Sequence, residues 1–455
     1  MKFIGVDLGT THTKAIVYDD VLNKVVASEI ANTPVQRDHT GFSRNPIDMR
    51  NTVCKLIRDV VRQVSEINEI AALSVASMGE EVVLLDEDCE PIGDIITWFD
   101  QRGTLEYTEI YNRVSDEFYK GVYIDPSFSL FKLLWIKDHR PDDLKRCRKV
   151  VDLGGYILGC LSGNYQVDWS HASRTGIFNI RSKRWNEEIC LIAELDGAIF
   201  PSLVPSGIKL GTLTPQSIRD TGLPPHTVIV SGGHDHLCAA YASGVRTGGE
   251  LFISAGTSEA HLLLSTKLLN EGSQAPSIEQ GCFVDDKHYY VHAGLPSGHV
   301  FAQWRNLLYK GVAESEMYAE IERVSEANTD IKFVFSSDLK KQSLMNFKYT
   351  TDRATLMRSI LEGLALKSSE MIDNLESILK HRIDTVTVSG HPARVPLWKE
   401  IRSSILNRPL SVIEEVETTA LGAALLAVRA CHPDISPHIA ERSIWPTTNL
   451  WGGTA

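Results

Sequence analysis

The chain lacks the features that mark nucleic-acid and membrane partners. No run of lysine or arginine offsets its formal net charge of −12, which argues against a surface for nucleic acid or anionic lipid. No apolar run reaches the length of a membrane span, and Met1 and Lys2 lead directly into an apolar segment instead of a signal peptide. We therefore expect a cytoplasmic protein whose partners are small molecules, with no nucleic acid and no membrane; a homodimer is left open.

Paired cysteines are also missing. The eight cysteines form no CxxC pair and no regular framework, which indicates buried thiols in a reducing compartment instead of disulfides or zinc ligands. Low-complexity segments and short-period repeats are absent as well. What is present is a chain of 455 residues, 43% apolar and 23% charged, which is long enough for two ordinary domains.

The most informative segment is Phe3–Lys14, FIGVDLGTTHTK. Its apolar run is typical of a buried strand, and Gly9 would let the next turn adopt backbone angles that other residues resist, so that the amides of Thr10 and Thr11 face a phosphate. Asp7, at the strand end, would hold the water shell of a Mg²⁺ ion. The segment predicts Mg-nucleotide chemistry; a tight hairpin between two core strands is the alternative.

A second copy of this pattern lies in the other half of the chain. Leu251–Leu264, LFISAGTSEAHLLL, again gives an apolar strand, a turn at Gly256 and Thr257, and another apolar strand. Two such turns are what a duplicated nucleotide fold needs to clamp a phosphate chain from both sides. The pattern breaks at Ser243–Gly249, so we expect domains at 1–244 and 245–455.

Strands and helices alternate along the chain, as in an α/β fold. Apolar residues at helical spacing predict helices at 46–68, 130–137, 237–243, 351–381 and 395–406. Short apolar runs predict strands at 71–75, 82–85, 227–230 and 385–388.

In this order the segments resemble the FGGY carbohydrate kinases, of the xylulokinase and gluconokinase kind, within the sugar kinase, heat-shock ATPase and actin superfamily. Besides the two turns, three segments carry the resemblance: Ile95–Arg102 (IITWFDQR), Val228–Gly244 (VIVSGGHDHLCAAYASG) and Glu417–Ala427 (ETTALGAALLA). The resemblance implies two actin-like, ribonuclease H-like domains with mixed sheets flanked by helices and a cleft between them. The first domain would bind the sugar and carry the first phosphate loop; the second would bind the nucleotide.

Asp235 is the candidate catalytic base. It follows Gly232 and Gly233 at the start of a predicted helix, whose N-terminus favours an anion. The local sequence by itself favours a helix cap, and the resemblance is what implies the base. The flanking His234 and His236 suggest a metal site, but further ligands cannot be identified; by the resemblance His236 contacts the acceptor, with a capping or surface histidine as the alternative.

The acceptor loop is expected at Ser77–Asp86, SMGEEVVLLD. By the resemblance Met78, Gly79 and Glu80 bind substrate, and Gly79 stands where glycerol kinases have Arg. Ser127, in VYIDPSFS, replaces the aromatic side chain that glycerol kinases hold over their substrate. Both differences argue against glycerol and for a longer acceptor. For Glu80 the alternative is a solvated loop carboxylate.

Three side chains of the WFDQR stretch would complete the acceptor site: Trp98 as a wall, Asp100 as a hydroxyl acceptor and Arg102 as an organising cation. Their alternative is a structural ion pair under a tryptophan.

On the nucleotide side the expected ligands of ATP are Gly9, Thr10, Thr11, Lys14, Gly256, Thr257, Ser258, Gly390 and Ala393, and the expected metal ligand is Asp7 for Mg²⁺. The turn Ser389–Trp398, SGHPARVPLW, departs from the glycine-rich turn of the family, because Pro392 removes an amide and fixes the backbone. This change predicts weaker or altered ATP binding. The start of Thr418–Ala424 would lie near the same pocket, or form a tight helix crossing.

The sequence thus predicts ATP-dependent phosphorylation of a primary hydroxyl of a sugar or polyol, with Asp235 and Asp7 as catalytic residues and a ketopentose or ketohexose as the favoured acceptor. Aldonates are less favoured, because Glu80 and Asp100 would repel a carboxylate. The alternative is a nucleotide-binding sugar sensor of the same fold with little transfer activity.

Overall fold

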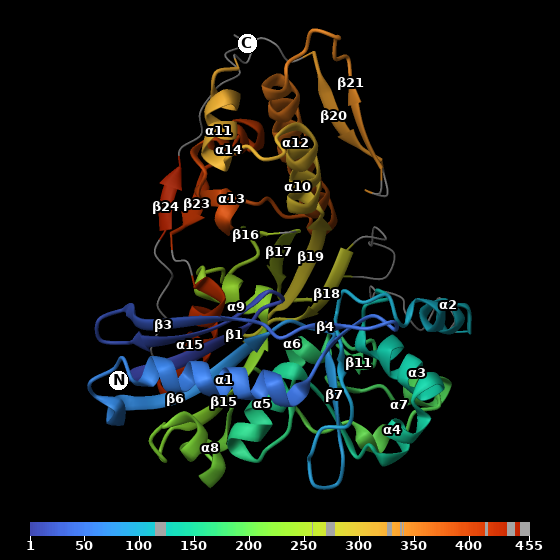
Figure 1. Ribbon diagram of the computed structural model, residues 1–455, viewed down its shortest axis with the longest axis vertical. Coiled ribbons are helices and arrows are strands. Elements are labelled where there is room, and N and C mark those ends of the chain that lie inside the picture. Colours follow the sequence, from blue (N-terminus) through green and yellow to red (C-terminus); the bar gives the residue numbers. More distant parts are fainter. Residues whose placement is uncertain are drawn as a thin grey trace.

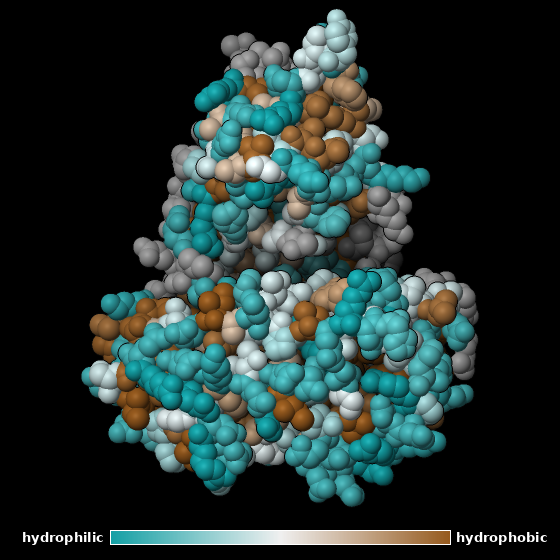
Figure 2. All heavy atoms as spheres, viewed as in Figure 1, coloured by the Kyte–Doolittle hydropathy of each residue, from teal (hydrophilic) through white to brown (hydrophobic). Residues whose placement is uncertain are grey.

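The computed structural model describes residues 1–113, 124–256, 258–269, 278–324, 330–336, 339, 341–414, 417–434 and 442–445. These residues form two lobes stacked along the long axis of the molecule (Figure 1). The lower lobe contains the N-terminal sheet, and the upper lobe contains most of the C-terminal half. The surface is hollowed between the two lobes (Figure 2).

The lower lobe is built on a six-stranded sheet with the order β14-β15-β6-β1-β2-β3. Its strands are β1 (Lys2–Leu8), β2 (His12–Asp19), β3 (Lys24–Asn32), β6 (Ile70–Ser77), β14 (Lys209–Thr212) and β15 (Val228–His234). β1 is antiparallel to β2 and parallel to β6, which is parallel to β15. This register brings the ends of β1, β6 and β15, and the loops that follow them, to one edge of the sheet.

The upper lobe repeats this plan in a seven-stranded sheet with the order β18-β19-β17-β16-β22-β23-β24. Its strands are β16 (Glu250–Ala255), β17 (Glu259–Ser265), β18 (Ile278–Cys282), β19 (Tyr289–Leu295), β22 (Thr385–Ser389), β23 (Leu410–Ile413) and β24 (Arg442–Trp445). Here β16 is antiparallel to β17 and parallel to β22, which is parallel to β23. The order β3-β2-β1-β6-β15 therefore recurs as β19-β17-β16-β22-β23, and the predicted duplication is confirmed.

Helices α1 (Pro46–Val61) and α5 (Leu153–Ser162) share a hydrophobic cluster with one face of the lower sheet. Asn45 caps α1, because its side-chain oxygen accepts the amides of Ile47 and Asp48. The expected extension of this helix to residue 68 is wrong. The chain leaves the helix after Val61 and forms a short 3₁₀ turn at Ile67–Glu69 before it enters β6.

The opposite face of the lower sheet is covered by α9 (Asp235–Ala242) and α15 (Thr418–Cys431). A Cβ atom on Gly422 would lie 2.0 Å from the carbonyl oxygen of Cys238, and one on Gly5 would lie 1.9 Å from that of Ala420. The small residues of α15 thus form a tight helix crossing, as the alternative interpretation held. Although α15 falls in the range 245–455, it packs on the sheet of the first lobe.

The remaining helices are α2 (Thr104–Arg113), α3 (Ser129–His139), α4 (Pro141–Arg146), α6 (Trp169–Ala172), α7 (Glu187–Ala193), α8 (Pro215–Thr221), α10 (Ser297–Leu308), α11 (Glu314–Glu322), α12 (Arg353–Leu379), α13 (His391–Arg394) and α14 (Pro396–Leu406). The short strands are β4 (Gln36–Arg37), β5 (Phe42–Arg44), β7 (Val82–Leu85), β8 (Ile95–Ile96), β9 (Lys149–Asp152), β10 (Val167–Asp168), β11 (Phe178–Asn179), β12 (Arg184–Trp185), β13 (Leu203–Val204), β20 (Lys332–Phe335) and β21 (Gln342–Met345). Among the described helices, none has both the length and the apolar character needed to cross a membrane.

Candidate active site

The turn between β1 and β2 is the first predicted phosphate turn. Its Gly9 donates its amide to the carbonyl oxygen of His12 at 3.2 Å, and a Cβ atom there would lie 2.8 Å from that oxygen. Gly9 is absent from the residues with left-handed backbone angles, so the predicted reason for this glycine is corrected: the turn needs it for close approach. Thr10 accepts a hydrogen bond from the indole of Trp98 at 2.9 Å, while the side chain of Thr11 is exposed.

Asp7 stands at the end of β1, opposite Lys14 in the ladder. Burial and then the charge of Asp235 raise the pKa of Asp7 to about 8, against the opposing charge of Lys14. Lys14 also forms a 2.8 Å ion pair with Glu417, directly before α15. Lys14 is therefore shared between Asp7 and Glu417, while Asp235 adds further negative charge near Asp7.

The second predicted phosphate turn joins β16 and β17. The amide of Gly256 donates to the carbonyl oxygen of Ser258 at 3.0 Å, and both residues are exposed. Thr257 lies outside the described residues.

The SGHPAR turn lies against the end of β16. Gly390 has a φ of +112°, and a Cβ atom on it would lie 2.0 Å from the carbonyl oxygen of Ala255. Glycine is therefore required here both by the backbone angle and by the close approach. Ala393 is buried in the apolar core of the upper lobe, so its side chain is not positioned to contact a nucleotide.

Asp235 is the first residue of α9, and the N-cap position belongs to His234. The Oδ1 atom of Asp235 accepts the amide of His236 at 2.7 Å. His236 is half-exposed and contacts the Ser254 hydroxyl of β16 at 3.3 Å. Asp235 thus stands at the boundary between the lobes, where its carboxylate accepts a first-turn amide of α9, and both the base and the capping interpretation stay open.

The histidines beside Asp235 do not form a metal centre with it. The Nδ1 atom of His234 lies 3.5 Å from the Asp235 carboxylate, and the Nε2 atom of His236 lies 4.0 Å from it. Burial and then the charge of Arg174 lower the pKa of His234 well below its ordinary value, so this imidazole is neutral. Among the described residues, the grouping of three potential metal ligands occurs elsewhere, at Asp152, Asp168 and His171.

Glu80 is not the solvated carboxylate that the sequence left open. It is 6% exposed, has a φ of +65°, and forms an ion pair with the guanidinium group of Arg174. A Cβ atom on Gly79 would lie 2.8 Å from the His234 ring and 3.2 Å from Cγ of Arg174. These two side chains occupy the space that a larger residue at position 79 would need.

Met78 does not line the acceptor site as predicted. Its side chain is 3% exposed, belongs to the core of the lower lobe, and directs its sulfur toward Arg44 at 3.7 Å.

Arg174 also forms an ion pair with Glu279 of β18, from the other half of the chain. Glu279 accepts a 2.8 Å hydrogen bond from the Tyr290 hydroxyl and lies 3.4 Å from Nδ1 of His292. Burial and the Arg174 charge lower the pKa of His292 to about 3, so it is neutral. The acceptor side thus contains a guanidinium group between two carboxylates, one from each half of the sequence.

The WFDQR stretch divides into two parts. Trp98 is partly exposed beside Thr10, which fits a wall between the acceptor and the first turn. Asp100 instead uses both carboxylate oxygens on Arg102 and on the amide of Phe42. The hydrogen bonds from Arg102 and Phe42 lower the pKa of Asp100 although burial alone would raise it. Asp100 and Arg102 therefore form the structural ion pair of the alternative interpretation, and we no longer count Asp100 as a hydroxyl acceptor.

Ser127 is half-buried at the start of the chain segment that enters α3. Its carbonyl oxygen accepts the ammonium group of Lys132, and its amide donates to Asp125 at 2.8 Å. Burial lowers the pKa of Lys132 to about 8 against the opposing charges of Glu80 and Glu81.

Sequence reasoning missed Arg174, Glu279, His292, Asp168 and His171. The signal for Glu279 was a single carboxylate in an apolar strand, where an unpaired charge is costly. The signal for Asp168, His171 and Arg174 was a dense run of polar residues, DWSHASRT. Neither signal says which residues meet, because the partners are up to 105 residues apart along the chain, as between Arg174 and Glu279.

A duplicated sheet with a strand-turn-strand unit in each half, and with Asp7 and Asp235 near each other, is the arrangement expected of a phosphotransferase of the actin-like fold. Family models agree over most of the chain: residues 2–242 match the N-terminal domain and residues 251–431 the C-terminal domain of the FGGY family of carbohydrate kinases. The protein belongs to this family and is a carbohydrate kinase, an ATP-dependent phosphotransferase that acts on an alcohol group.

Individual relatives are distant. The chain is 24% identical to a xylulose kinase of Bacillus subtilis, over 94% of this chain and 88% of the relative, and 24% identical to a gluconokinase of the same organism, over 94% and 87%. It is 26% identical to an L-fuculokinase of Escherichia coli, over 96% and 94%.

Solved structures share the fold. A xylulose kinase from Lactobacillus acidophilus gives a TM-score of 0.88 at 20% identity, covering 98% of this chain and 94% of that one. A glycerol kinase from Plasmodium falciparum gives 0.85 at 20% identity, covering 96% and 90%.

Proposed function

We propose that this kinase phosphorylates a primary hydroxyl of an uncharged ketopentose or ketohexose, or of a polyol of similar length. The observation that carries the proposal is the arrangement of Glu80, Arg174 and Glu279. Arg174 has one positive charge and the two carboxylates have two negative charges, so the three side chains together have a net negative charge. It favours hydroxyl donors and disfavours the carboxylate of an aldonate.

Glycerol fits this site poorly. The side chain that would contact a three-carbon substrate is missing at Gly79, and Ser127 leaves the opposite wall short. A small triol would leave some of the buried polar groups without partners, and unpaired groups are what produce strong discrimination.

In the proposed reaction Asp235 takes the proton of the acceptor hydroxyl. The hydroxyl oxygen then bonds to the γ-phosphorus of ATP, the bond from that phosphorus to the β-γ bridging oxygen breaks, and ADP leaves. Trp98 and the walls between the lobes exclude water, so that the sugar hydroxyl is the acceptor.

The nucleotide ligands are proposed at the two turns, through Gly9, Thr10, Thr11, Gly256, Thr257, Ser258 and Gly390, with Lys14 beside them. Asp7, through its water shell, would hold Mg²⁺, which supplies charge neutralisation at the phosphates. The raised pKa of Asp7 is the observation that fits such a cation. The altered SGHPAR turn was the reason to consider a sensor without transfer activity. Because Gly390 still packs this turn against the end of β16, the turn does not favour the sensor.

An ATP-consumption screen over ketoses, polyols, glycerol and aldonates tests the proposal. The highest turnover is expected with a neutral five- or six-carbon compound. An aldonate or glycerol as the best acceptor would contradict it.

A further inference from the structure

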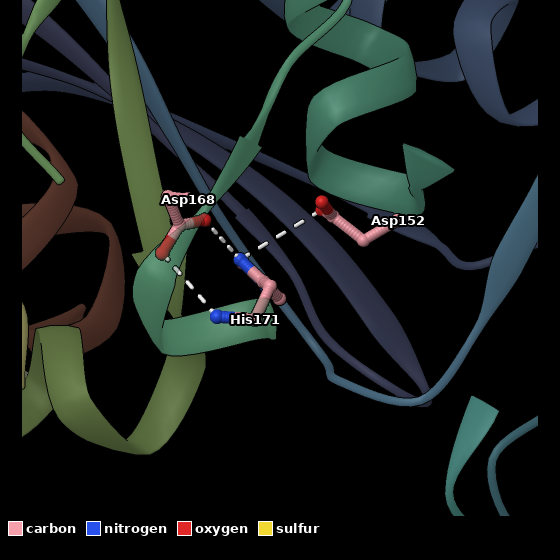
Figure 3. A group of neighbouring side chains, drawn as sticks. All are labelled: Asp152, Asp168 and His171. Atoms are coloured by element: carbon pink, nitrogen blue, oxygen red, sulfur yellow. Dashed lines mark hydrogen bonds and ion pairs between the residues drawn. The ribbon is translucent and has the colours of Figure 1, made fainter. Parts of the chain in front are cut away.

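A buried hydrogen-bond network lies directly behind the proposed site. It is centred on Asp168, the last residue of β10. Asp168 is 6% exposed. The Oδ1 atom accepts hydrogen bonds from the Ser170 hydroxyl and, at 3.1 Å, from the Ser206 hydroxyl. The Oδ2 atom contacts Nδ1 of His171, and Asp152 lies 3.7 Å from the same nitrogen (Figure 3).

The first arm of the network runs to the base. The Ser170 hydroxyl accepts the backbone amide of His234 at 2.9 Å, and His234 directly precedes Asp235. A hydroxyl group has one proton to donate, and here that proton is used on Asp168. Its lone pairs must therefore face His234, so Asp168 fixes the direction of this hydrogen bond. Ser170 is fully buried, and no solvent competes for the contact.

The second arm runs to the acceptor loop. Nε2 of His171 lies 2.8 Å from the Ser77 hydroxyl and 3.1 Å from the Ser77 carbonyl oxygen. Ser77 is the last residue of β6 and the first residue of the predicted acceptor loop. Burial alone would lower the pKa of His171, but the charges of Asp152 and Asp168 raise it to about 10, so the ring is an imidazolium that donates from both nitrogens.

This imidazolium also explains why the Asp152, Asp168 and His171 group needs no metal. The positive charge between the two carboxylates is carried by the ring itself, and Nδ1, the atom that would coordinate a cation, is used as a donor. The group is therefore better described as a rigid support than as a cation site.

We propose that Asp168 is a positioning residue that sets the geometry between the base, through Ser170 and His234, and the acceptor loop, through His171 and Ser77. The proposal rests on the proposed function, because it assigns Asp235 as the base. The two arms act on different steps: loss of the base arm should lower kcat, and loss of the acceptor arm should raise the KM of the acceptor. Ser206 bonds to the same carboxylate oxygen, but its chain neighbours Pro205 and Gly207 contact Ser231 of β15 instead of His234 or Ser77.

The same substitution, serine to alanine, at three positions separates the effects of the two arms. Ser170→Ala should lower kcat about 10- to 100-fold with little change in the KM of the acceptor, since a displacement near 1 Å has effects of this size. Ser77→Ala should raise the KM of the acceptor several-fold with little change in kcat; the bond to the Ser77 carbonyl limits the effect. Ser206→Ala, the matched control, should change neither constant. Equal loss of kcat in Ser170→Ala and Ser206→Ala would overturn the proposal.

Amide hydrogen exchange decides the proposal independently of activity. Peptides covering residues 233–236 should exchange about 10-fold faster in Ser170→Ala, and peptides covering 76–81 should do so in Ser77→Ala. Neither peptide should change in Ser206→Ala. If the parent protein phosphorylates no acceptor, the proposed function fails, but this exchange pattern still supports or refutes the positioning role. The same acceleration in all three variants would refute it.

Discussion

Replacing Arg174 by methionine tests how the acceptor site is held together. The change keeps an apolar stem that can still pack on the ring of Phe128, which the guanidinium group now covers at 4.9 Å. It removes the cation between Glu80 and Glu279, whose side chains are only 5% and 7% exposed. Tyr290 and His292 still contact Glu279, but among the described residues Glu80 has no second ion-pair partner.

The expected cost is the cost of breaking a buried ion pair from one side. Such a change destabilises a protein by about 3–5 kcal/mol, because it leaves an uncompensated charge out of water. The matched double variant Arg174→Met with Glu80→Gln removes the charge as well as its partner. It should recover about 1–3 kcal/mol of that loss, the usual size of the coupling between residues in contact.

Urea unfolding of the parent, Arg174→Met, Glu80→Gln and the double variant measures these values. Turnover with the best neutral acceptor and with the matching aldonate then shows what the charges select. Glu80→Gln should raise the aldonate rate relative to the neutral acceptor, since it removes one of the repelling carboxylates. If Arg174→Met is as stable as the parent within about 0.5 kcal/mol, or if the double variant recovers nothing, the reasoning about this buried ion pair is wrong.

Four further outcomes are expected. Asp235→Asn should lower turnover about 10²- to 10⁴-fold while the thermal midpoint and ATP binding stay unchanged; near-normal turnover would place the base elsewhere. In the metal-free protein the pKa of Asp7 is about 8, against 3.8 for an ordinary aspartate, so the contribution of Asp7 to stability is lost as the pH rises through 8. Mg²⁺ should therefore raise the thermal midpoint more at about pH 9 than at about pH 6, and Asp7→Asn should remove this difference. The raised pKa of His171, about 10 against 6.5, gives a stability contribution that is complete below pH 6.5 and lost as the pH rises through 10; urea midpoints between these limits should fall more steeply in the parent than in His171→Asn, and parallel profiles would contradict the assignment. Gly390→Ala should destabilise the protein by about 2–4 kcal/mol and raise the KM of ATP, because its Cβ would lie 2.0 Å from the Ala255 carbonyl at a φ of +112°; an unchanged KM would show that this turn does not contact the nucleotide.

The repeated strand-turn-strand pattern was readable from the sequence because each copy is local. Phe3–Lys14 and Leu251–Leu264 carry their apolar runs and glycines within a dozen residues, and both became antiparallel pairs with a turn between them. The long helix of the upper lobe was equally local: a period of 3.6 residues predicted 351–381, and α12 spans Arg353–Leu379. Helix ends were less certain, as α1 shows, because the chain turn that ends a helix depends on packing.

The acceptor site shows what local patterns leave undetermined. The sequence picked Glu80 but not its partner, and it misassigned Met78 and Asp100, whose side chains turned out to be used by the core and by Arg102. Burial of a polar side chain is a property of the neighbours that surround it, and these neighbours come from distant segments.

The sequence by itself determined the duplicated α/β plan with a strand-turn-strand unit in each half, and membership in a carbohydrate kinase family; the roles of Asp7 and Asp235 stay predictions. Only the tertiary structure decided which charges meet: Arg174 with Glu80 and Glu279, Lys14 with Glu417, and Asp168 with His171. The physical reason is distance along the chain. A strand or a turn is selected by interactions among neighbouring residues, whereas a buried charge is tolerated only where folding supplies a partner from another segment.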